Sequence, residues 1–237
     1  IASNGEAALV VWRGHRGETV GFIRGAWIEW GTGGDWVIEE MVLGGPPCSS
    51  DGTCADEQVC STSIDTCTTT FGGQDQPAVA SNGENFLVGW QETRNMMYRG
   101  YDIYGAEVKK NNGNLEVTHN IPIAITMDYA YHIALTAVGN DYFTAWRHKL
   151  MIDPIDQDIH GAIVQFTTDG YAVGDESPVA NMLGDQGYPA VAHGNNEVTV
   201  AYHDHRNHGS DYSPEVVGSR VEVSGDSFSL LEDEFSI

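Results

Sequence analysis

Histidines gather in one short stretch near the end of the sequence, where His203, His205 and His208 surround Asp204. In a strand, alternate side chains share a face, so His203 and His205 would point the same way. Imidazole and carboxylate groups are ligands for transition metals. The stretch therefore predicts a metal site. The alternative is a solvated hairpin that merely tolerates histidines, because Arg206 in its middle would oppose a cation.

Three tryptophans, Trp27, Trp30 and Trp36, lie close together around a glycine-rich turn. Aromatic rings at a surface offer large apolar faces to a ligand, so these residues predict a binding platform that could stack on sugars. The alternative is packing between structural repeats, or against the cysteine-containing segment that follows.

Acidic residues near predicted turns offer oxygen ligands for calcium. None of them follows the full EF-hand spacing, so a structural calcium ion is the cofactor that the sequence allows without specifying its site. The residues concerned are Asp51, Asp56, Glu57, Asp153, Asp156 and Asp158.

The motifs of several common enzyme classes are absent from the sequence. There is no G-x-S-x-G nucleophile turn, no phosphate-binding P-loop and no dinucleotide-binding glycine fingerprint. Carboxylates could serve as a glycosidase pair, but with 34 acidic residues any chosen pair is uninformative. We therefore predict no catalytic residue.

These candidates lie on a fourfold internal repeat. The aromatic residues Trp90, Trp146 and Tyr202 are each 56 residues apart, and Trp12 begins the series before a cysteine-containing insertion. Each copy has a small apolar run, a run that ends at the aromatic, a run around a glycine and a final run. Turn formers such as Asn82-Gly83 separate the runs. No window of helical length shows the apolar spacing of an amphipathic helix.

Four strands in a repeat of this length predict an all-β fold, a β-propeller with four four-stranded blades. We expect the small run to be innermost and the aromatic to fill the wedge between blades. One domain would span 1–237, with blades at about 1–45, 74–125, 126–180 and 181–237 and an insertion at 46–73. The propeller either closes with four blades, which we favour, or is a segment of a longer one.

All four cysteines lie in the insertion, and none forms the close C-x2-C pair typical of zinc sites. An even number of cysteines in a glycine- and serine-rich stretch favours two disulfides formed in an oxidising compartment. Three pairings are open, and we favour Cys48–Cys60 with Cys54–Cys67.

The repeat resembles one found in secreted and surface β-propeller proteins of bacteria, W-x-D-x-R-N-G followed by D-I-Y-G-x-R-V. The second copy carries Trp90-Gln-Glu-Thr-Arg94-Asn95 and Asp102-Ile-Tyr-Gly105, and the fourth carries Tyr202-His-Asp204-His-Arg206-Asn207. The third copy departs from the pattern, with Leu150 in place of the arginine. The cysteine run is similar to inserts in secreted myxobacterial proteins. The resemblance implies a propeller and secretion, and it does not specify a function.

The acidic and basic residues of this motif predict a repeated salt-bridge clasp. The acid and the arginine lie two residues apart and would share one face of a strand, and a second acid would close the pair across the hairpin. The predicted members are Glu92, Arg94, Asp102, Asp204, Arg206 and Glu215.

The formal net charge of −23 opposes binding to nucleic acid and to anionic lipid. No apolar stretch approaches the ~20 residues of a membrane helix. The sequence begins at Ile1 rather than at methionine, so either a leader has been removed or the chain is a piece of a longer one.

We expect a secreted or cell-surface module that is not an enzyme and that binds a glycan or an extracellular protein in adhesion or assembly. The alternative is a polysaccharide-active enzyme, or its accessory domain, with a site at the channel mouth.

Overall fold

The structure, a computed structural model, describes residues 1–14, 21–44, 58–61, 66–69, 73–93, 100–151, 157–195, 197–206 and 214–237. Within these ranges the chain forms strands and turns, and no helix. It follows that no helix there is long and apolar enough to cross a membrane. The predicted all-β class is confirmed.

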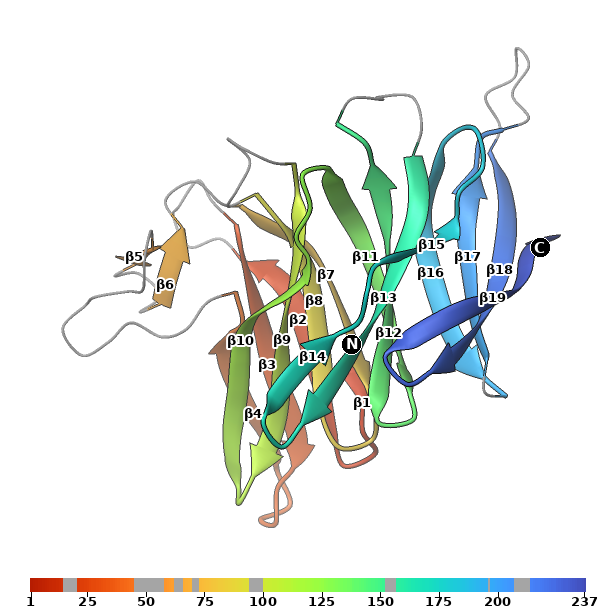
Figure 1. Cartoon of the computed structure of the whole chain (residues 1–237). Helices are drawn as coiled ribbons and strands as arrows, with labels where there is room; N and C mark the ends of the chain where they lie inside the picture. Colours follow the sequence, from red (N-terminus) through yellow and green to blue (C-terminus); the bar gives the residue numbers. More distant parts are fainter. Residues whose placement is uncertain are drawn as a thin grey trace.

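Four antiparallel sheets follow one another along the chain, coloured from red to blue in Figure 1. Three have four strands and the third has five, because β15 also pairs with β13. The first sheet is β1 (Ala2–Ser3), β2 (Ala7–Gly14), β3 (Phe22–Trp30) and β4 (Trp36–Val42), and the second is β7 (Gln74–Ser81), β8 (Phe86–Glu92), β9 (Asp102–Asn111) and β10 (Asn114–Ala124). The third is β11 (Tyr129–Val138), β12 (Asp141–Lys149), β13 (Gln157–Thr167), β14 (Gly170–Val173) and β15 (Ser177–Ala180), and the fourth is β16 (Gln186–Gly194), β17 (Glu197–Asp204), β18 (Glu215–Ser224) and β19 (Ser227–Ser236).

The hairpins form where the sequence places asparagine and glycine. In the turn between β9 and β10, Asn112 and Gly113 both have positive φ, 50° and 83°, as the tight turns preferred by β-hairpins require. Between β7 and β8, the Asn82 side chain accepts hydrogen bonds from the backbone amides of Glu84 and Asn85 at 3.0 and 2.8 Å. Such asparagine turns set the register of the strands on either side.

The first strand of each sheet packs against the first strand of the next. β7 contacts β11, and β11 contacts β16, while β1 and β2 contact β7. Hydrophobic cores fill the space between neighbouring sheets. Trp90, Trp146 and Tyr202 each lie in the core that joins their own sheet to the preceding one, with at most 2% of their surface exposed. This confirms the predicted wedge position of the repeated aromatic. Trp12, whose sheet has no predecessor in the described chain, is half-buried.

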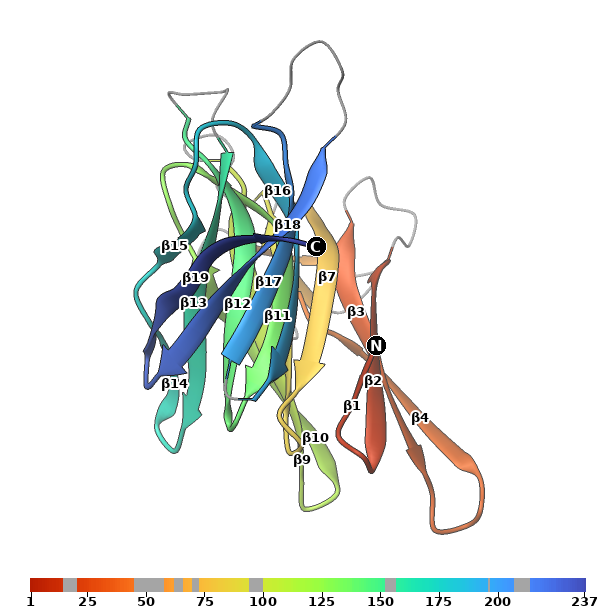
Figure 2. The same cartoon turned by 90° about the vertical axis from the view of Figure 1, so that its right-hand side faces the viewer.

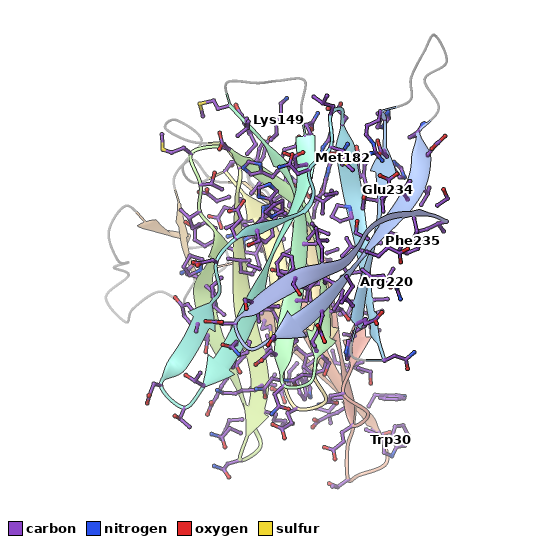
Figure 3. The ribbon with its side chains drawn as sticks, turned by 45° about the vertical axis from the view of Figure 1, so that its right-hand side comes forward. Trp30, Lys149, Met182, Arg220, Glu234 and Phe235 are labelled. Carbon is purple, nitrogen blue, oxygen red and sulfur yellow. The ribbon has the colours of Figure 1, made fainter. Side chains whose placement is uncertain are left out.

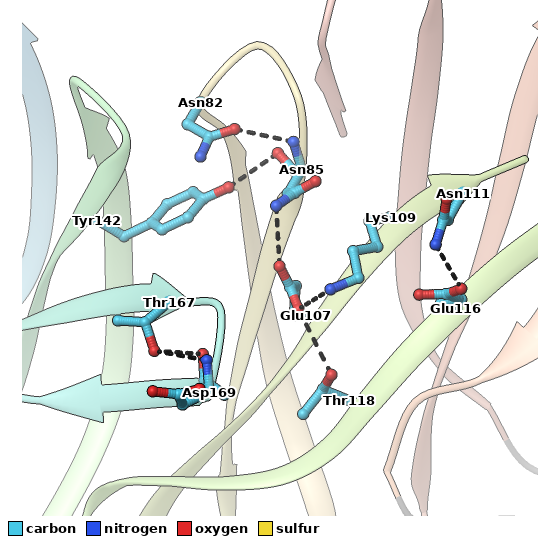
Figure 4. A network of polar contacts seen from close by, with 11 residues as sticks. Asn82, Asn85, Glu107, Lys109, Asn111, Glu116, Thr118, Tyr142, Thr167 and Asp169 are labelled. Atoms are coloured by element: carbon cyan, nitrogen blue, oxygen red, sulfur yellow. Dashed lines mark hydrogen bonds and ion pairs between the residues drawn. The ribbon is translucent and has the colours of Figure 1, made fainter.

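Polar contacts join the second and third sheets at their hairpin turns (Figure 4). The Tyr142 hydroxyl donates to the backbone carbonyl of Asn85 at 2.8 Å, and burial raises the pKa of Tyr142 well above its usual range. Asn85 Nδ2 in turn donates to the buried carboxylate of Glu107 at 2.9 Å, which also accepts from Lys109 and Thr118. The Tyr142–Asn85 bond links the two sheets, and the Glu107 contacts lie within the second sheet and brace the turn that carries Asn85.

The first and fourth sheets show no such mutual packing among the described residues, so closure of a four-bladed ring is not seen there. Figure 2 shows the first sheet, in red and orange, at one edge of the arrangement.

In the predicted insertion, β5 (Gln58–Ser61) and β6 (Thr66–Thr69) form a hairpin in which the backbones of Cys60 and Cys67 lie opposite one another. Cys48 and Cys54 lie outside the described residues, and the disulfide pairing stays a prediction.

Candidate functional site

The predicted tryptophan platform is divided by the fold. Trp30 and Trp36 face each other across the end of the β3–β4 hairpin, 59% and 65% exposed, with ring centroids 5.0 Å apart. Trp27 is only 2% exposed and packs edge-on against Phe86 of the second sheet. Burial removes Trp27 from any surface platform, while a ligand role for Trp30 and Trp36 stays a prediction.

The structure does not gather the three predicted metal ligands of the fourth sheet that it describes. Asp204 is 4% exposed and accepts hydrogen bonds from the backbone amide of Arg206, at 2.8 Å, and from its Nε, at 2.5 Å. His203 is half-buried beside Tyr188, with ring centroids 5.5 Å apart. His208 lies outside the described residues. Among those described, His203, Asp204 and His205 do not bring three ligand atoms within 4.8 Å of one another.

The acidic positions of the predicted clasp are mostly buried, and in the fourth sheet the second acid differs from the prediction. In the second sheet, Glu92 accepts hydrogen bonds from Trp90 Nε1 at 3.0 Å and Gln74 Nε2 at 3.2 Å. Asp102 lies opposite Glu92 in the register and is buried, whereas Arg94 lies outside the described residues.

In the fourth sheet, the second acid that pairs with the arginine of the clasp is not the predicted Glu215. Arg206 pairs with Asp204 and with Glu234 of β19. Glu215 lies opposite Asp204 in the register but is exposed. The carboxylates of Glu234 and Asp204 raise the pKa of Arg206, which therefore stays charged. The prediction misplaced the second acid because the fourth strand of the sheet, rather than the third, presents it.

Of the predicted calcium ligands, only Asp158 is described; it is buried on β13, and a calcium site stays a prediction.

A strained backbone feature recurs in the innermost strands of the second, third and fourth sheets. Gln76, His132 and Tyr188 have φ of 51°, 58° and 54°, and each lies at a bulge in the pairing of its strand. The three residues are 56 positions apart. Positive φ is costly for a residue that is not glycine, and such strain collects at functional sites. The bulges are therefore candidate positions for a functional site.

At the bulges of β11 and β16, aromatic rings, an arginine and a carboxylate meet. His132 stacks on Tyr188 with centroids 4.4 Å apart and an interplanar angle of 22°. The Arg147 guanidinium lies 5.2 Å from the ring centroid of Tyr131 and 5.7 Å from that of Tyr188. Asp185 lies 4.0 Å from Arg147. We call these five residues the bulge cluster.

Protonation in the bulge cluster follows from burial. Desolvation raises the pKa of Tyr131, whose hydroxyl donates to Gln157 Oε1 at 2.6 Å, so the phenol stays protonated at neutral pH. Desolvation, helped by the charge on Arg147, lowers the pKa of His132, so its imidazole is neutral there. Gln157 Nε2 donates to Asp185 at 3.0 Å and orients that carboxylate.

Two polar atoms of the bulge cluster are buried without a partner in the described part of the chain. They are Arg147 Nε and His132 Nδ1. Native structures rarely leave buried polar atoms unsatisfied, and a bound ligand is one explanation where they are. With two tyrosine rings close to the arginine, the cluster is built to hold a polar ligand against apolar surfaces.

The bulge cluster is not apparent from the sequence. Its members are separated along the chain, and only the bulges bring them together. One signal was present: Arg147 directly follows the repeated aromatic Trp146, as Arg13 follows Trp12 and His203 follows Tyr202. Because strand side chains alternate, a residue next to a wedge aromatic must point to the opposite face.

The bulge cluster and the exposed tryptophan pair lie at opposite ends of the molecule. Figure 3 places Lys149, at the end of β12 close to Arg147, far from Trp30. A ligand at the bulge cluster would therefore not touch the Trp30–Trp36 pair.

No protein-family model matches the chain, and no curated protein sequence matches it. Its fold is similar to solved structures of carbohydrate-processing enzymes. A Trypanosoma rangeli sialidase in complex with 2,3-difluorosialic acid superposes with a TM-score of 0.52 at 9% identity, over 97% of this chain and 36% of the sialidase chain. A B. megaterium levansucrase superposes with a TM-score of 0.50 at 10% identity, over 96% of this chain and 64% of the levansucrase.

The chain thus spans about a third of the sialidase and under two thirds of the levansucrase. The likenesses overturn our expectation of a non-enzymatic binding, adhesion or assembly module, because the structures that share the fold belong to sialidases and levansucrases. What these comparisons establish for the chain itself is a propeller-like, all-β fold.

Proposed function

We propose that the chain is a carbohydrate-active enzyme, or part of one, that binds a glycan at the bulge cluster. The observation that carries the proposal is the proximity of the Arg147 guanidinium to the rings of both Tyr131 and Tyr188, with Asp185 beside it. Aromatic faces suit the apolar faces of sugar rings, and the guanidinium and carboxylate suit their hydroxyl groups. The likeness in fold to sialidases and levansucrases supports this substrate class.

In this proposal Asp185 is a proton donor or acceptor for cleavage of a glycosidic bond. Its side chain is 37% exposed, so a substrate can reach it, and Gln157 holds one of its oxygens. Glycosidases use carboxyl groups as acid, base or nucleophile. Tyr131 remains a neutral phenol and serves as a hydrogen-bonding and stacking group rather than as a nucleophile.

The experiment measures sugar release from a panel of polysaccharides and aryl glycosides. We expect hydrolysis by the wild-type protein and a loss of about 100-fold or more in Asp185→Asn. Tyr188→Ala should mainly weaken binding. Gln76→Ala changes the equivalent bulge of β7, outside the bulge cluster, and is the matched control. Absence of hydrolysis across the panel, or equal rates for Asp185→Asn and wild type, would overturn the proposal.

We also propose that the four sheets are blades of a propeller-like ring, either closed or continued by further blades. The repeat and the contacts between successive first strands support this. We retain the secreted or cell-surface location as a proposal that is supported by the spacing of the cysteines and by the resemblance of the repeat.

A further inference from the structure

Two histidines and two carboxylates meet at one end of the third sheet, outside the bulge cluster. His148 of β12 stacks on His160 of β13, with centroids 4.1 Å apart and an interplanar angle of 14°. Glu176 comes directly before β15, and Asp128 directly before β11. One ligand atom each from His148, His160 and Glu176 lie within 4.8 Å of one another.

The distances around His148 fit metal ligation better than hydrogen bonding. Its Nε2 lies 3.6 Å from Asp128 Oδ2 and 4.0 Å from Glu176 Oε1. Both distances exceed a normal hydrogen bond. Ligand atoms about 2.1 Å from a tetrahedral zinc ion are about 3.4 Å apart, so rotation of the two imidazoles out of their parallel stack would let His148, His160 and Glu176 close around one ion. His160 Nδ1, 2.6 Å from Glu176 Oε1, would exchange that contact for the metal.

The repeat shows that His148 is a departure from a structural pattern. The same position holds Glu92 in the second sheet and Asp204 in the fourth, where the carboxylates accept hydrogen bonds from Trp90 and Arg206. In the third sheet, the arginine is replaced by Leu150. Trp146 Nε1, the counterpart of the Trp90 donor, is buried without a partner among the described residues. The third copy has thus lost the structural carboxylate and gained an imidazole.

The imidazole of His148 is buried at the site. His148 is 7% exposed, and its Nε2 points at two carboxylates without a hydrogen bond of normal length to either. Glu176, Asp128 and His160 have side chains 30%, 27% and 16% exposed, which leaves an entry path from solvent. Two carboxylates would neutralise a divalent cation.

We propose that His148 Nε2, His160 Nδ1 and Glu176 Oε1 bind one zinc-class divalent ion. Two imidazoles and one carboxylate are a known protein ligand set for zinc, with water in the fourth position. The ion would link the segment before β15 to strands β12 and β13, with Asp128 beside His148, and would stabilise the folded protein. The site is distinct from the histidine stretch of the fourth sheet and is independent of the proposed glycan chemistry.

The test is calorimetric titration of the chelator-treated full chain with zinc chloride, with circular dichroism to establish that each variant is folded. We expect one zinc ion per chain, a higher melting temperature with zinc, and affinity at least about tenfold lower in His160→Gln and in Glu176→Gln. The matched control is His203→Gln/His205→Gln, which should bind as the wild type does. Cobalt should give the intense visible absorption of a tetrahedral site.

Failure of zinc to bind the wild type would overturn the proposal. So would undiminished binding in folded His160→Gln and Glu176→Gln proteins. Loss of binding in the His203→Gln/His205→Gln control alone would place the ion in the fourth sheet and equally contradict it.

Discussion

The guanidinium of Arg147, on the second strand of the third sheet, lies 5.7 Å from the ring centroid of Tyr188, on the first strand of the fourth. Two other residue pairs make the equivalent contact, from the second strand of one sheet to the first strand of the next. Arg13 Nη1 bonds Asp75 Oδ2 at 3.1 Å, and Gln91 Oε1 accepts from the backbone amide of His132 at 3.2 Å. In each, the residue after the wedge aromatic reaches the bulge of the next sheet. Packing on one strand face and polar contacts on the other thus join successive sheets.

The pair Arg147–Tyr188 should show a measurable coupling. We expect a double-mutant cycle of Arg147→Met and Tyr188→Leu, followed by urea unfolding, to give a coupling free energy of about 0.5–1 kcal/mol from the cation–π contact. A cycle of Arg220→Met with Tyr188→Leu is the control, because Arg220 pairs with Glu197 and Glu232 instead. Equal coupling in both cycles would contradict a specific contact.

Loss of a wedge aromatic should be costly. Trp90 is fully buried and donates to Glu92, so Trp90→Ala should lower the free energy of unfolding by about 3–5 kcal/mol. Trp36→Ala removes an exposed ring and should change it by about 0.5 kcal/mol or less. Similar urea midpoints for the two variants would show that the wedge is not what holds the sheets together.

The repeated glycine of the third strand should not tolerate a side chain. A Cβ at Gly161 would lie 2.8 Å from the Thr144 carbonyl oxygen and 3.1 Å from the Phe143 ring. Gly161→Ala should therefore destabilise the fold by about 1–3 kcal/mol, because the neighbouring backbone must move. Gly33→Ala, where a Cβ meets nothing within 4 Å, is the control. Thermal unfolding of both proteins distinguishes them, and equal stability would be contrary evidence.

Acidification should destabilise the protein through buried histidines. Desolvation lowers the pKa of His119, whose Nδ1 lies 3.2 Å from the Leu43 carbonyl oxygen, and that of His132. The unfolded chain, with histidine pKa values of about 6.5, then binds more protons than the folded one as the pH falls below neutrality. The stability that these neutral imidazoles contribute is present above about pH 6.5 and is lost as the pH falls toward their folded pKa values.

Urea unfolding as a function of pH checks this effect. The decline in stability below neutrality should be shallower in His119→Gln than in the wild type. An identical pH profile in the two proteins would argue against a depressed pKa at His119.

The sequence predicted those features that repeat. The 56-residue spacing fixed the wedge positions of Trp90, Trp146 and Tyr202, and asparagine–glycine pairs fixed hairpin turns. Both depend on local propensity and alternation, which a sequence displays directly.

The candidate sites were not predictable in the same way. Trp27 could not be placed in the core from its alignment, because its partner Phe86 comes from another sheet. The bulge at His132 adds a residue to one strand without any glycine to signal it. Arg206 pairs with Glu234 because β19 runs back along the sheet and places Glu234 beside it. Each of these contacts depends on three-dimensional registration between segments.

The direction of the contacts between sheets has a consequence for how such a chain can evolve. The second and third sheets each contact the following sheet through a residue on their second strand and the preceding sheet through a residue on their first strand. A duplicated copy can therefore be inserted without inventing new contacts, since it arrives with both residues. Once such contacts exist in several copies, one of them can diverge while the others preserve the architecture. Arg13 and Arg147 illustrate this, because the partner of Arg13 is the carboxylate of Asp75 and that of Arg147 is the ring of Tyr188.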